Sequence, residues 1–266
     1  MSPVFFSYSS SCGALFEAAS KEVSGGTKIP LELVTNDTSF PTASHNLDHQ
    51  WLFASTLTDA EFATSLAIRI GNVPNHLRVY PSKCACGNFI GDVNEQIVHT
   101  FSCDRFTGYT HTHRHNRVRD AMARVANEFG ISCTKEPTCY AYESNKKRPD
   151  ILFHTPNMLV TDVSVVSPSM DNPGHHLSQI EKVKHKDHSA ATATLQHIFI
   201  PAVFEVYGLM GKQFHLLVHE LAKHLPTAMK REFERQMKDA VSNALAAGRS
   251  ASLFSSKMRF SETLVR

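Results

Sequence analysis

The stretch RPDILFHTPNMLVTDVSVV, residues 148–166, contains two β-rich runs on either side of a short polar turn. The turn residues 155–157, Thr-Pro-Asn, suit a three-residue connection, because proline fixes φ and asparagine tolerates a left-handed conformation. Pairing the residues that flank this turn puts Asp150 opposite Asp162. A bulge at the turn would shift the register by one residue. The stretch therefore predicts a hairpin that places two aspartates side by side.

Two carboxylates in this arrangement repel each other, and like charges opposite on neighbouring strands are destabilising. They must share a proton or hold a cation, and Mg²⁺ is a common partner for carboxylate oxygens. The alternative is a different turn, in which Asp150 and Asp162 diverge and each caps a strand end. Glu136, at the end of the preceding predicted strand, is a candidate third carboxylate, and Glu128 competes with it.

Basic residues accompany the hairpin in three clusters, at 111–119, 146–148 and 182–186. Such clusters either form solvated faces or bind anions, even on a chain whose formal net charge is only +2. Lys182, Lys184 and Lys186 fall on the next predicted helix, where a lysine can orient water or neutralise developing charge beside a phosphate.

Working outward, apolar periodicity predicts a small α/β domain with a mixed sheet flanked by helices. The predicted elements are a helix from about 116 to 129, a strand at 131–137, the hairpin, a helix at 176–193, a strand at 197–208, and helices at 212–224 and 227–246. Upstream, Thr58 and Glu61 form a capping box that opens a further helix. Gly130 occupies the position that glycine favours after a helix.

Four residues between the first helix and the core have the spacing of a zinc site: Cys84 and Cys86, then His99 and Cys103. Structural zinc takes four tetrahedral nitrogen or sulfur ligands, which two close pairs joined by a loop supply. The pattern Cys-x-Cys is tighter than the common Cys-x₂-Cys, and His111, His113 and His115 are rival ligands. Buried free cysteines with a chance histidine are the alternative.

The 266 residues have ordinary globular composition, with 42% hydrophobic and 20% charged residues. No apolar run approaches the roughly 20 residues that span a bilayer, and the N-terminus lacks a positive leader. We therefore expect an intracellular protein, nuclear in a eukaryotic cell, without a membrane partner and with reduced or metal-bound cysteines.

An ordered set of motifs resembles the restriction-like endonuclease domain of site-specific non-LTR retrotransposons, which has a PD-(D/E)XK core. The motifs are Cys-x-Cys, HTFSC, RHNRVRD, KEP, RPDIL, TDVSVV, a lysine-bearing helix and FIPAVFEVYG, and they cover roughly residues 58–225. The resemblance implies an enzyme that depends on Mg²⁺ or Mn²⁺ and nicks DNA. It implies that Asp150 and Asp162 bind the catalytic metal.

The chain departs from this family at Ser164, which stands where a lysine is usual. In the family that lysine often moves to the following helix, where Lys184 fits best and Lys182 and Lys186 remain candidates. Phosphate contacts are expected from a further set: Arg114, Arg117, Lys147, Arg148 and Lys186.

The expected organisation is an arm at 1–57, a helix and zinc module at 58–110, the nuclease core at 111–225 and a helical extension at 226–266. No Tyr-x-Asp-Asp motif of a reverse transcriptase is present. The chain would be an isolated domain of such a polyprotein, a domesticated copy or a stand-alone relative. Two other functions remain open: a non-catalytic, zinc-containing nucleic-acid-binding module, and a Holliday-junction-resolvase-like nuclease, which would act as a homodimer.

Overall fold

The structure, a computed structural model, describes most of the chain after residue 56. The described residues are 57–69, 84, 86–88, 93–103, 105, 111–140, 148–167 and 173–262. The predicted arm at 1–57, apart from its last residue, and Lys147 lie outside them. Within the described residues the fold is mixed α/β, as predicted. The predicted elements occur in order, but a helix at Val93–Ser102 was not predicted, and the predicted strand at 197–208 is divided into Ile198–Phe199 and Ala202–Glu205. The last helix runs to Glu262 and not to residue 246.

The first helix of the core, α5 (Thr112–Glu128), ends as its sequence predicts. Gly130 has a φ of +81°, its N–H donates to Asn127, and the next N–H reaches back to Ala126. This is a Schellman cap, which glycine favours because it has no Cβ to strain the left-handed conformation. The predicted start near residue 116 is wrong by about a turn, because the buried side chain in the first turn is Arg114, which gives no apolar signal.

The sheet begins with three antiparallel strands and continues with parallel ones. Its strands are β1 (Cys133–Lys135), β2 (Ile151–Phe153), β3 (Leu159–Thr161), β4 (Val163–Val166), β5 (Ile198–Phe199) and β6 (Ala202–Glu205). The hydrogen-bonded order is β1-β2-β3-β5, and β4 pairs with β6. The N–H of Ile200 donates to the carbonyl of Val160, and the N–H of Ala202 donates to the carbonyl of Asp162. These hydrogen bonds connect the β3–β5 pair to the β4–β6 pair, and Asp162 lies between β3 and β4.

The hairpin of β2 and β3 has the predicted register. Ile151 pairs with Thr161, which puts the preceding Asp150 opposite Asp162. The connection is longer than the three residues expected, because Phe153 and Leu159 form the last pair. The left-handed residue is Met158, with a φ of 44°, and not Asn157.

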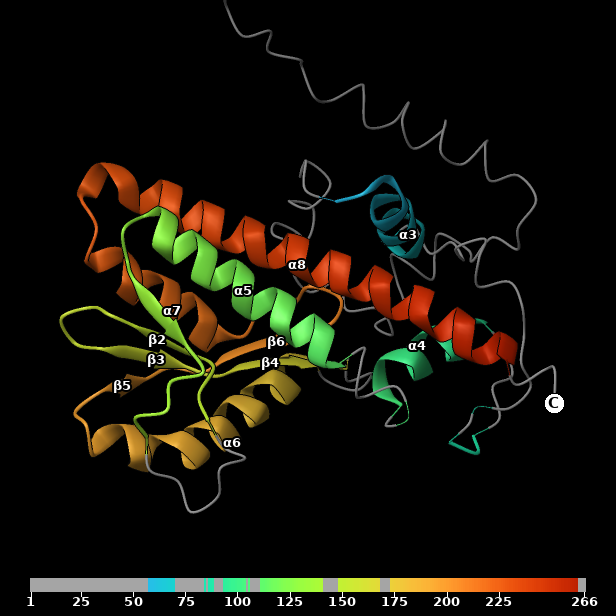
Figure 1. Ribbon diagram of the computed structural model, residues 1–266, viewed down its shortest axis with the longest axis horizontal. Helices are drawn as coiled ribbons and strands as arrows, with labels where there is room; N and C mark the ends of the chain where they lie inside the picture. The colour runs from blue at the N-terminus through green and yellow to red at the C-terminus, as the bar shows by residue number, and fades with distance from the viewer. Residues whose placement is uncertain are drawn as a thin grey trace, which may run out of the picture.

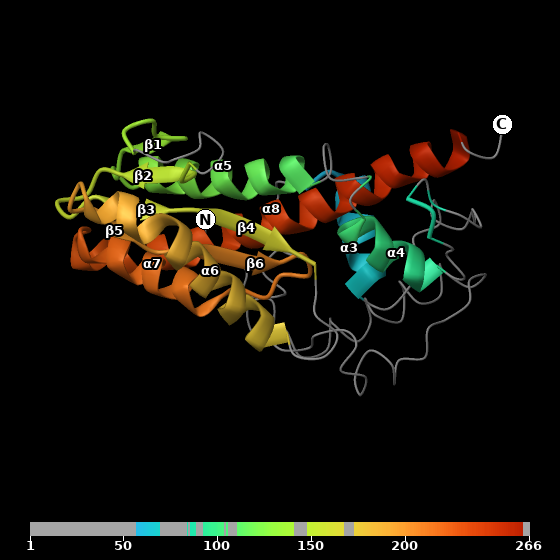
Figure 2. The ribbon, with the colours of Figure 1, turned by 90° about the horizontal axis from the view of Figure 1, so that it is seen from below.

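Helices cover both faces of the sheet (Figures 1 and 2). On one face, α5, α7 (Lys212–Lys223) and α8 (Thr227–Glu262) enclose the main apolar core with side chains such as Ile151, Phe153 and Phe204. On the other face lies α6 (Pro173–Ala193), above a smaller cluster of Leu152, Val160 and Phe199. Because side chains alternate along a strand, Asp162 shares the α6 face with Val160.

The long helix α8 joins the two ends of the molecule, as Figure 1 shows. Its first half contributes Phe233, Met237 and Val241 to the main core. Its second half contacts α3 (Asp59–Arg69) and α4 (Val93–Ser102), where Ser250 donates to the carbonyl of Glu61. The capping box that opens α3 is confirmed: the N–H of Thr58 donates to Glu61, and the N–H of Glu61 donates to the hydroxyl of Thr58.

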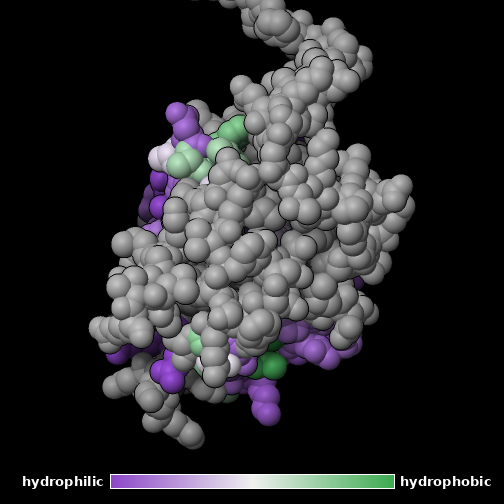
Figure 3. Space-filling model, turned by 90° about the vertical axis from the view of Figure 1, so that its right-hand side faces the viewer, coloured by the Kyte–Doolittle hydropathy of each residue, from purple (hydrophilic) through white to green (hydrophobic). Residues whose placement is uncertain are grey.

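The helices of the described residues are too short or too polar to cross a bilayer. On the face drawn in Figure 3, the described residues that reach the surface are mostly hydrophilic, with smaller apolar areas between them.

Candidate metal and catalytic centres

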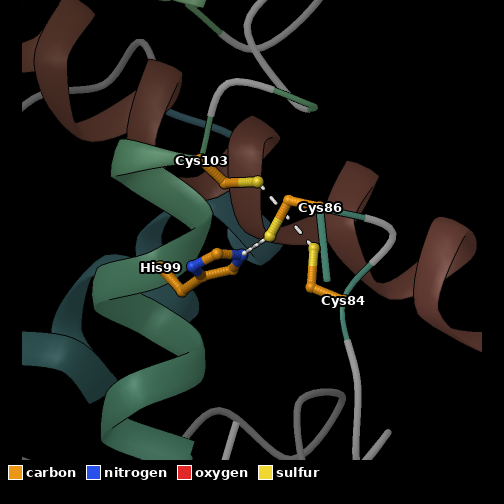
Figure 4. A group of neighbouring side chains, drawn as sticks. All are labelled: Cys84, Cys86, His99 and Cys103. Atoms are coloured by element: carbon orange, nitrogen blue, oxygen red, sulfur yellow. Dashed lines mark hydrogen bonds between the residues drawn. The ribbon is translucent and has the colours of Figure 1, made fainter. Parts of the chain in front are cut away.

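The predicted zinc ligands converge in the structure (Figure 4). Cys84 and Cys86 come from a tight turn in which the N–H of Gly87, at a φ of +96°, donates to the carbonyl of Cys84. His99 lies on α4 and Cys103 directly follows it, so the two are one helical turn apart on the same side. Two short local structures therefore present two ligands each.

The distances between these ligand atoms suit a tetrahedral zinc site. All four lie within 4.8 Å of one another. The thiols of Cys84 and Cys103 are 3.8 Å apart, and Cys86 Sγ is 3.4 Å from His99 Nε2. Zinc–sulfur bonds of about 2.3 Å and zinc–nitrogen bonds of about 2.0 Å imply ligand separations of roughly 3.5 to 3.8 Å at tetrahedral angles. The cluster can therefore hold a metal ion such as zinc.

Burial controls the thiol chemistry of this cluster. It raises the pKa of Cys84 to about 12, so this thiol stays neutral without a cation beside it. A hydrogen bond from the backbone of Asn88 lowers the pKa of Cys86. A metal ion supplies the positive charge that makes a buried thiolate stable.

The second centre is formed by the two aspartates of the hairpin. Asp150 and Asp162 are 8% and 6% exposed. Asp150 Oδ2 accepts two hydrogen bonds, one of 2.6 Å from the N–H of Val163 and one of 2.9 Å from His115 Nε2. These carboxylates come from neighbouring strands and are therefore held close together inside the protein.

Helix α6 adds a lysine and a histidine to this centre. Lys184 Nζ lies 2.6 Å from Asp162 Oδ2, and His188 Nε2 lies 3.7 Å from Asp162 Oδ1. The two residues are one turn apart on the buried side of α6, where the ring of His188 stacks on Phe199 at 4.9 Å. Of the three candidate lysines, the structure thus brings Lys184 to the aspartates. Lys182 and Lys186 are exposed on the same helix.

Electrostatics at Asp162 reflect this crowding. Burial, followed by the negative charge of Asp150, raises the pKa of Asp162 to about 6. The positive charge of Lys184 opposes the rise and does not cancel it. The carboxylate is therefore ionised at neutral pH at a cost in stability.

The sequence suggested His115 only as a rival zinc ligand, and the structure gives it a different partner. Its Nε2 faces Asp150, and its Nδ1 lies 3.2 Å from Asn116 Oδ1. Burial alone would lower the pKa of His115, but the hydrogen bond and charge of Asp150 outweigh burial and raise it. In the sequence, the one sign of a special role for His115 was the RHN run at 114–116, and this run does not reveal that the partner of His115 lies 35 residues away.

The two glutamates proposed as a third carboxylate are used elsewhere. The N–H of Glu136 donates to the carbonyl of Asp150, but its exposed side chain pairs with Arg119. Glu128 is exposed and pairs with Arg124 on its own helix. No contact to either aspartate is seen for these two side chains in the described residues, so the structure does not favour a catalytic role for them.

The expected phosphate contacts divide into buried and exposed residues. Arg114 is 1% exposed, lies over the ring of Phe101 and donates to the carbonyl of that residue, so a surface phosphate contact is wrong for it. Arg117 is partly exposed and pairs with Glu61 at 3.3 Å. Arg148 and Lys186 are exposed and stay candidates.

Ser164 follows Asp162 on the next strand of the chain. Ser164 is half-buried on β4, two residues beyond Asp162 and on the same side of the strand. Lys184 brings its ammonium group to Asp162 from α6, on the face that Ser164 shares.

Comparisons with known proteins add no relative to this picture. The sequence matches no protein-family model and no curated protein. The functional assignment of this chain therefore rests on the geometry of its two centres.

Proposed function

We propose that this chain is a metal-dependent endonuclease with a PD-(D/E)XK-like core, which cleaves a phosphodiester bond of DNA. The observation that carries the proposal is the contact between Lys184 of α6 and Asp162, on a hairpin whose register sets Asp162 opposite Asp150. Two carboxylates and a lysine from the following helix are the set that this class of nuclease needs. The resemblance to retrotransposon endonucleases supports target-strand nicking, by an element or by a domesticated copy.

The donor set suits Mg²⁺ or Mn²⁺, because it consists of carboxylate oxygens, which are the ligands that these cations prefer. Asp150 Oδ1 makes no hydrogen bond to any described residue, whereas the carboxylate of Asp162 contacts Lys184 and His188. Asp150 and Asp162 would hold the ion. When bound, the ion supplies a nucleophilic water at neutral pH and stabilises charge on the phosphate.

The chain's own residues contribute position and charge. Lys184 Nζ, at 2.6 Å from Asp162, can donate to a water or to a phosphate oxygen without leaving the centre. The hydrogen bonds to Asp150 hold its carboxylate in place, and burial under α6 shields the carboxylate of Asp162 from bulk water. Arg148 and Lys186 would contact the DNA backbone, which gives affinity without sequence information.

A nicking assay on supercoiled DNA with Mg²⁺ or Mn²⁺ tests the proposal. Asp150→Asn, Asp162→Asn and Lys184→Ala should each lose nicking by about 100-fold or more, since the first two remove a ligand of the ion and the third removes a positive charge beside the phosphate. Lys182→Ala is the matched control, because Lys182 is an exposed lysine on the same helix, and it should keep most of the activity. Equal activity of the Lys184 and Lys182 variants would refute the proposed role of this centre.

Ser164 favours a second candidate, a zinc-containing module that binds nucleic acid without cutting it. In that case the wild type binds DNA and fails to nick it with either metal. A preference for four-way junctions over duplex DNA would instead assign a resolvase activity to the same centre.

A further inference from the structure

One carboxylate of the acidic pair is held by a side chain that the proposed chemistry does not itself use. Asp150 Oδ2 accepts the N–H of Val163 at 2.6 Å and His115 Nε2 at 2.9 Å. The same oxygen therefore receives two donors from two elements, the sheet and α5. The other oxygen, Oδ1, makes no hydrogen bond within the described residues, so the carboxylate is fixed at one end and available at the other.

The ring of His115 is itself fixed. Its Nδ1 lies 3.2 Å from Asn116 Oδ1, so both ring nitrogens have an oxygen neighbour. The preceding residue, Arg114, is buried against Phe101, and its Cγ lies so close to Gly248 that a Cβ there would be only 2.7 Å away. The first turn of α5 is thereby clamped between α4 and α8, and His115 cannot shift along its helix axis without breaking this packing.

We propose that His115 is a positioning residue, which holds Asp150 by Oδ2 and leaves Oδ1 for the catalytic metal ion; the inference rests on the function proposed above. Without the hydrogen bond from His115, the Asp150 carboxylate would keep only the one from the N–H of Val163, so it would be held less firmly and would have to be ordered further when the ion binds. Groups that hydrogen-bond to metal ligands typically change metal affinity by about 10- to 100-fold when they are removed. His115 does not touch the reacting atoms in this scheme.

A structural role would have different consequences from a positioning role. If His115 only fills space on α5, variants should rank by side-chain volume. If it acts through Nε2, the position of the donor atom decides whether a variant keeps the hydrogen bond to Asp150. Glutamine places its amide nitrogen near the position of Nε2, whereas asparagine places it near that of Nδ1. His115→Gln should then retain the contact with Asp150, and His115→Asn should lose it.

The experiment measures Mn²⁺ binding to the full, zinc-loaded chain by electron paramagnetic resonance of the free ion. His115→Ala and His115→Asn should bind Mn²⁺ about 10- to 100-fold more weakly than the wild type. His115→Gln should bind within a few fold of the wild type. In nicking assays the first two should need correspondingly more Mn²⁺ for half-maximal rate, while kcat at saturating Mn²⁺ changes much less. His219→Gln, an exposed histidine on α7, is the matched control and should behave as the wild type.

The outcomes separate this inference from the proposed function. Wild-type affinity in both His115→Ala and His115→Asn overturns the positioning role. Equal loss in the glutamine and asparagine variants also overturns it, because the contact at Nε2 would not matter. If the wild type and Asp162→Asn bind Mn²⁺ equally, the proposed metal centre fails and the inference fails with it. Melting curves of every variant, followed by circular dichroism, check that each protein is folded, so that only folded proteins are compared.

Discussion

Asp162→Asn offers a sharp test of the acidic centre, because its effect on stability should depend on pH. Burial and the charge of Asp150 raise the pKa of Asp162 from 3.8 to about 6 in the folded protein. When folding raises the pKa of a carboxyl group, the favourable contribution of that group to the free energy of unfolding is complete only at pH values below its pKa in the unfolded chain. That stability is lost as the pH rises through the folded pKa. Asparagine has the shape of the neutral carboxyl and no such pH dependence.

The size of the effect follows from the two pKa values. Between pH 5 and pH 8 the wild type should lose about 1.4 kcal/mol of unfolding free energy that the variant keeps. For a chain of this size that corresponds to roughly 3 to 6 °C in melting temperature. Lys184, which loses its charged partner in the variant, is 27% exposed and can turn toward water.

Urea unfolding of both proteins at pH 5 and pH 8, zinc-loaded and without added Mg²⁺, measures this difference. The variant should gain stability relative to the wild type as the pH rises. Mg²⁺ at 100 times its dissociation constant should then stabilise the wild type by about 2.7 kcal/mol and the variant much less. A difference that is constant with pH, or a variant that loses stability relative to wild type at pH 8, would refute the reasoning. So would a wild type indifferent to Mg²⁺.

Four further predictions test other parts of the structure. Cys103→Ser should lose zinc, measured by atomic absorption, and melt at a lower temperature, because metal binding contributes to folding in such sites; full zinc retention would contradict the cluster. Glu205 is fully buried, and burial raises its pKa to about 7, so Glu205→Gln should be more stable than the wild type by about 3 kcal/mol at pH 8 and by much less at pH 4.5. Gly211→Ala should destabilise by about 1–3 kcal/mol in urea unfolding, because its Cβ would lie 2.3 Å from Glu181 Oε1 and 2.9 Å from the carbonyl oxygen of Val203; wild-type stability would contradict the close approach. Arg114→Met should leave DNA affinity and its salt dependence unchanged, whereas Arg148→Ala should weaken binding and make the salt dependence shallower.

Local features of this protein could be predicted from its sequence, because each depends on residues close together in the chain. The capping box at Thr58 and the glycine cap after α5 are set by neighbours within one turn. The hairpin register follows from alternation and from the short connection, which leave little choice in how β2 meets β3. The spacing of Cys84, Cys86, His99 and Cys103 indicated their convergence, since a turn and a helix turn each bring two ligands together.

The choice of lysine shows what only the tertiary structure decided. Successive residues of α6 are rotated by about 100° around the helix axis, so Lys182, Lys184 and Lys186 point in different directions. The orientation of the helix against the sheet therefore decides which of them reaches Asp162. The buried side of α6 carries Glu181 and His188 among its residues, while Val183 is exposed. Hydrophobic periodicity therefore gives no signal for the face that meets Asp162.

The same reason explains the residues that sequence analysis placed wrongly or missed. Arg114 stands in a basic run that looks solvated, yet packing between α4, α5 and α8 buries it on Phe101. His115, next to it, meets Asp150 only because the clamped first turn of α5 lies beside the start of β2. The sequence by itself determined the hairpin and the metal-ligand spacing. The packing of helices on the sheet, which depends on many distant contacts at once, decided which side chains complete the acidic centre.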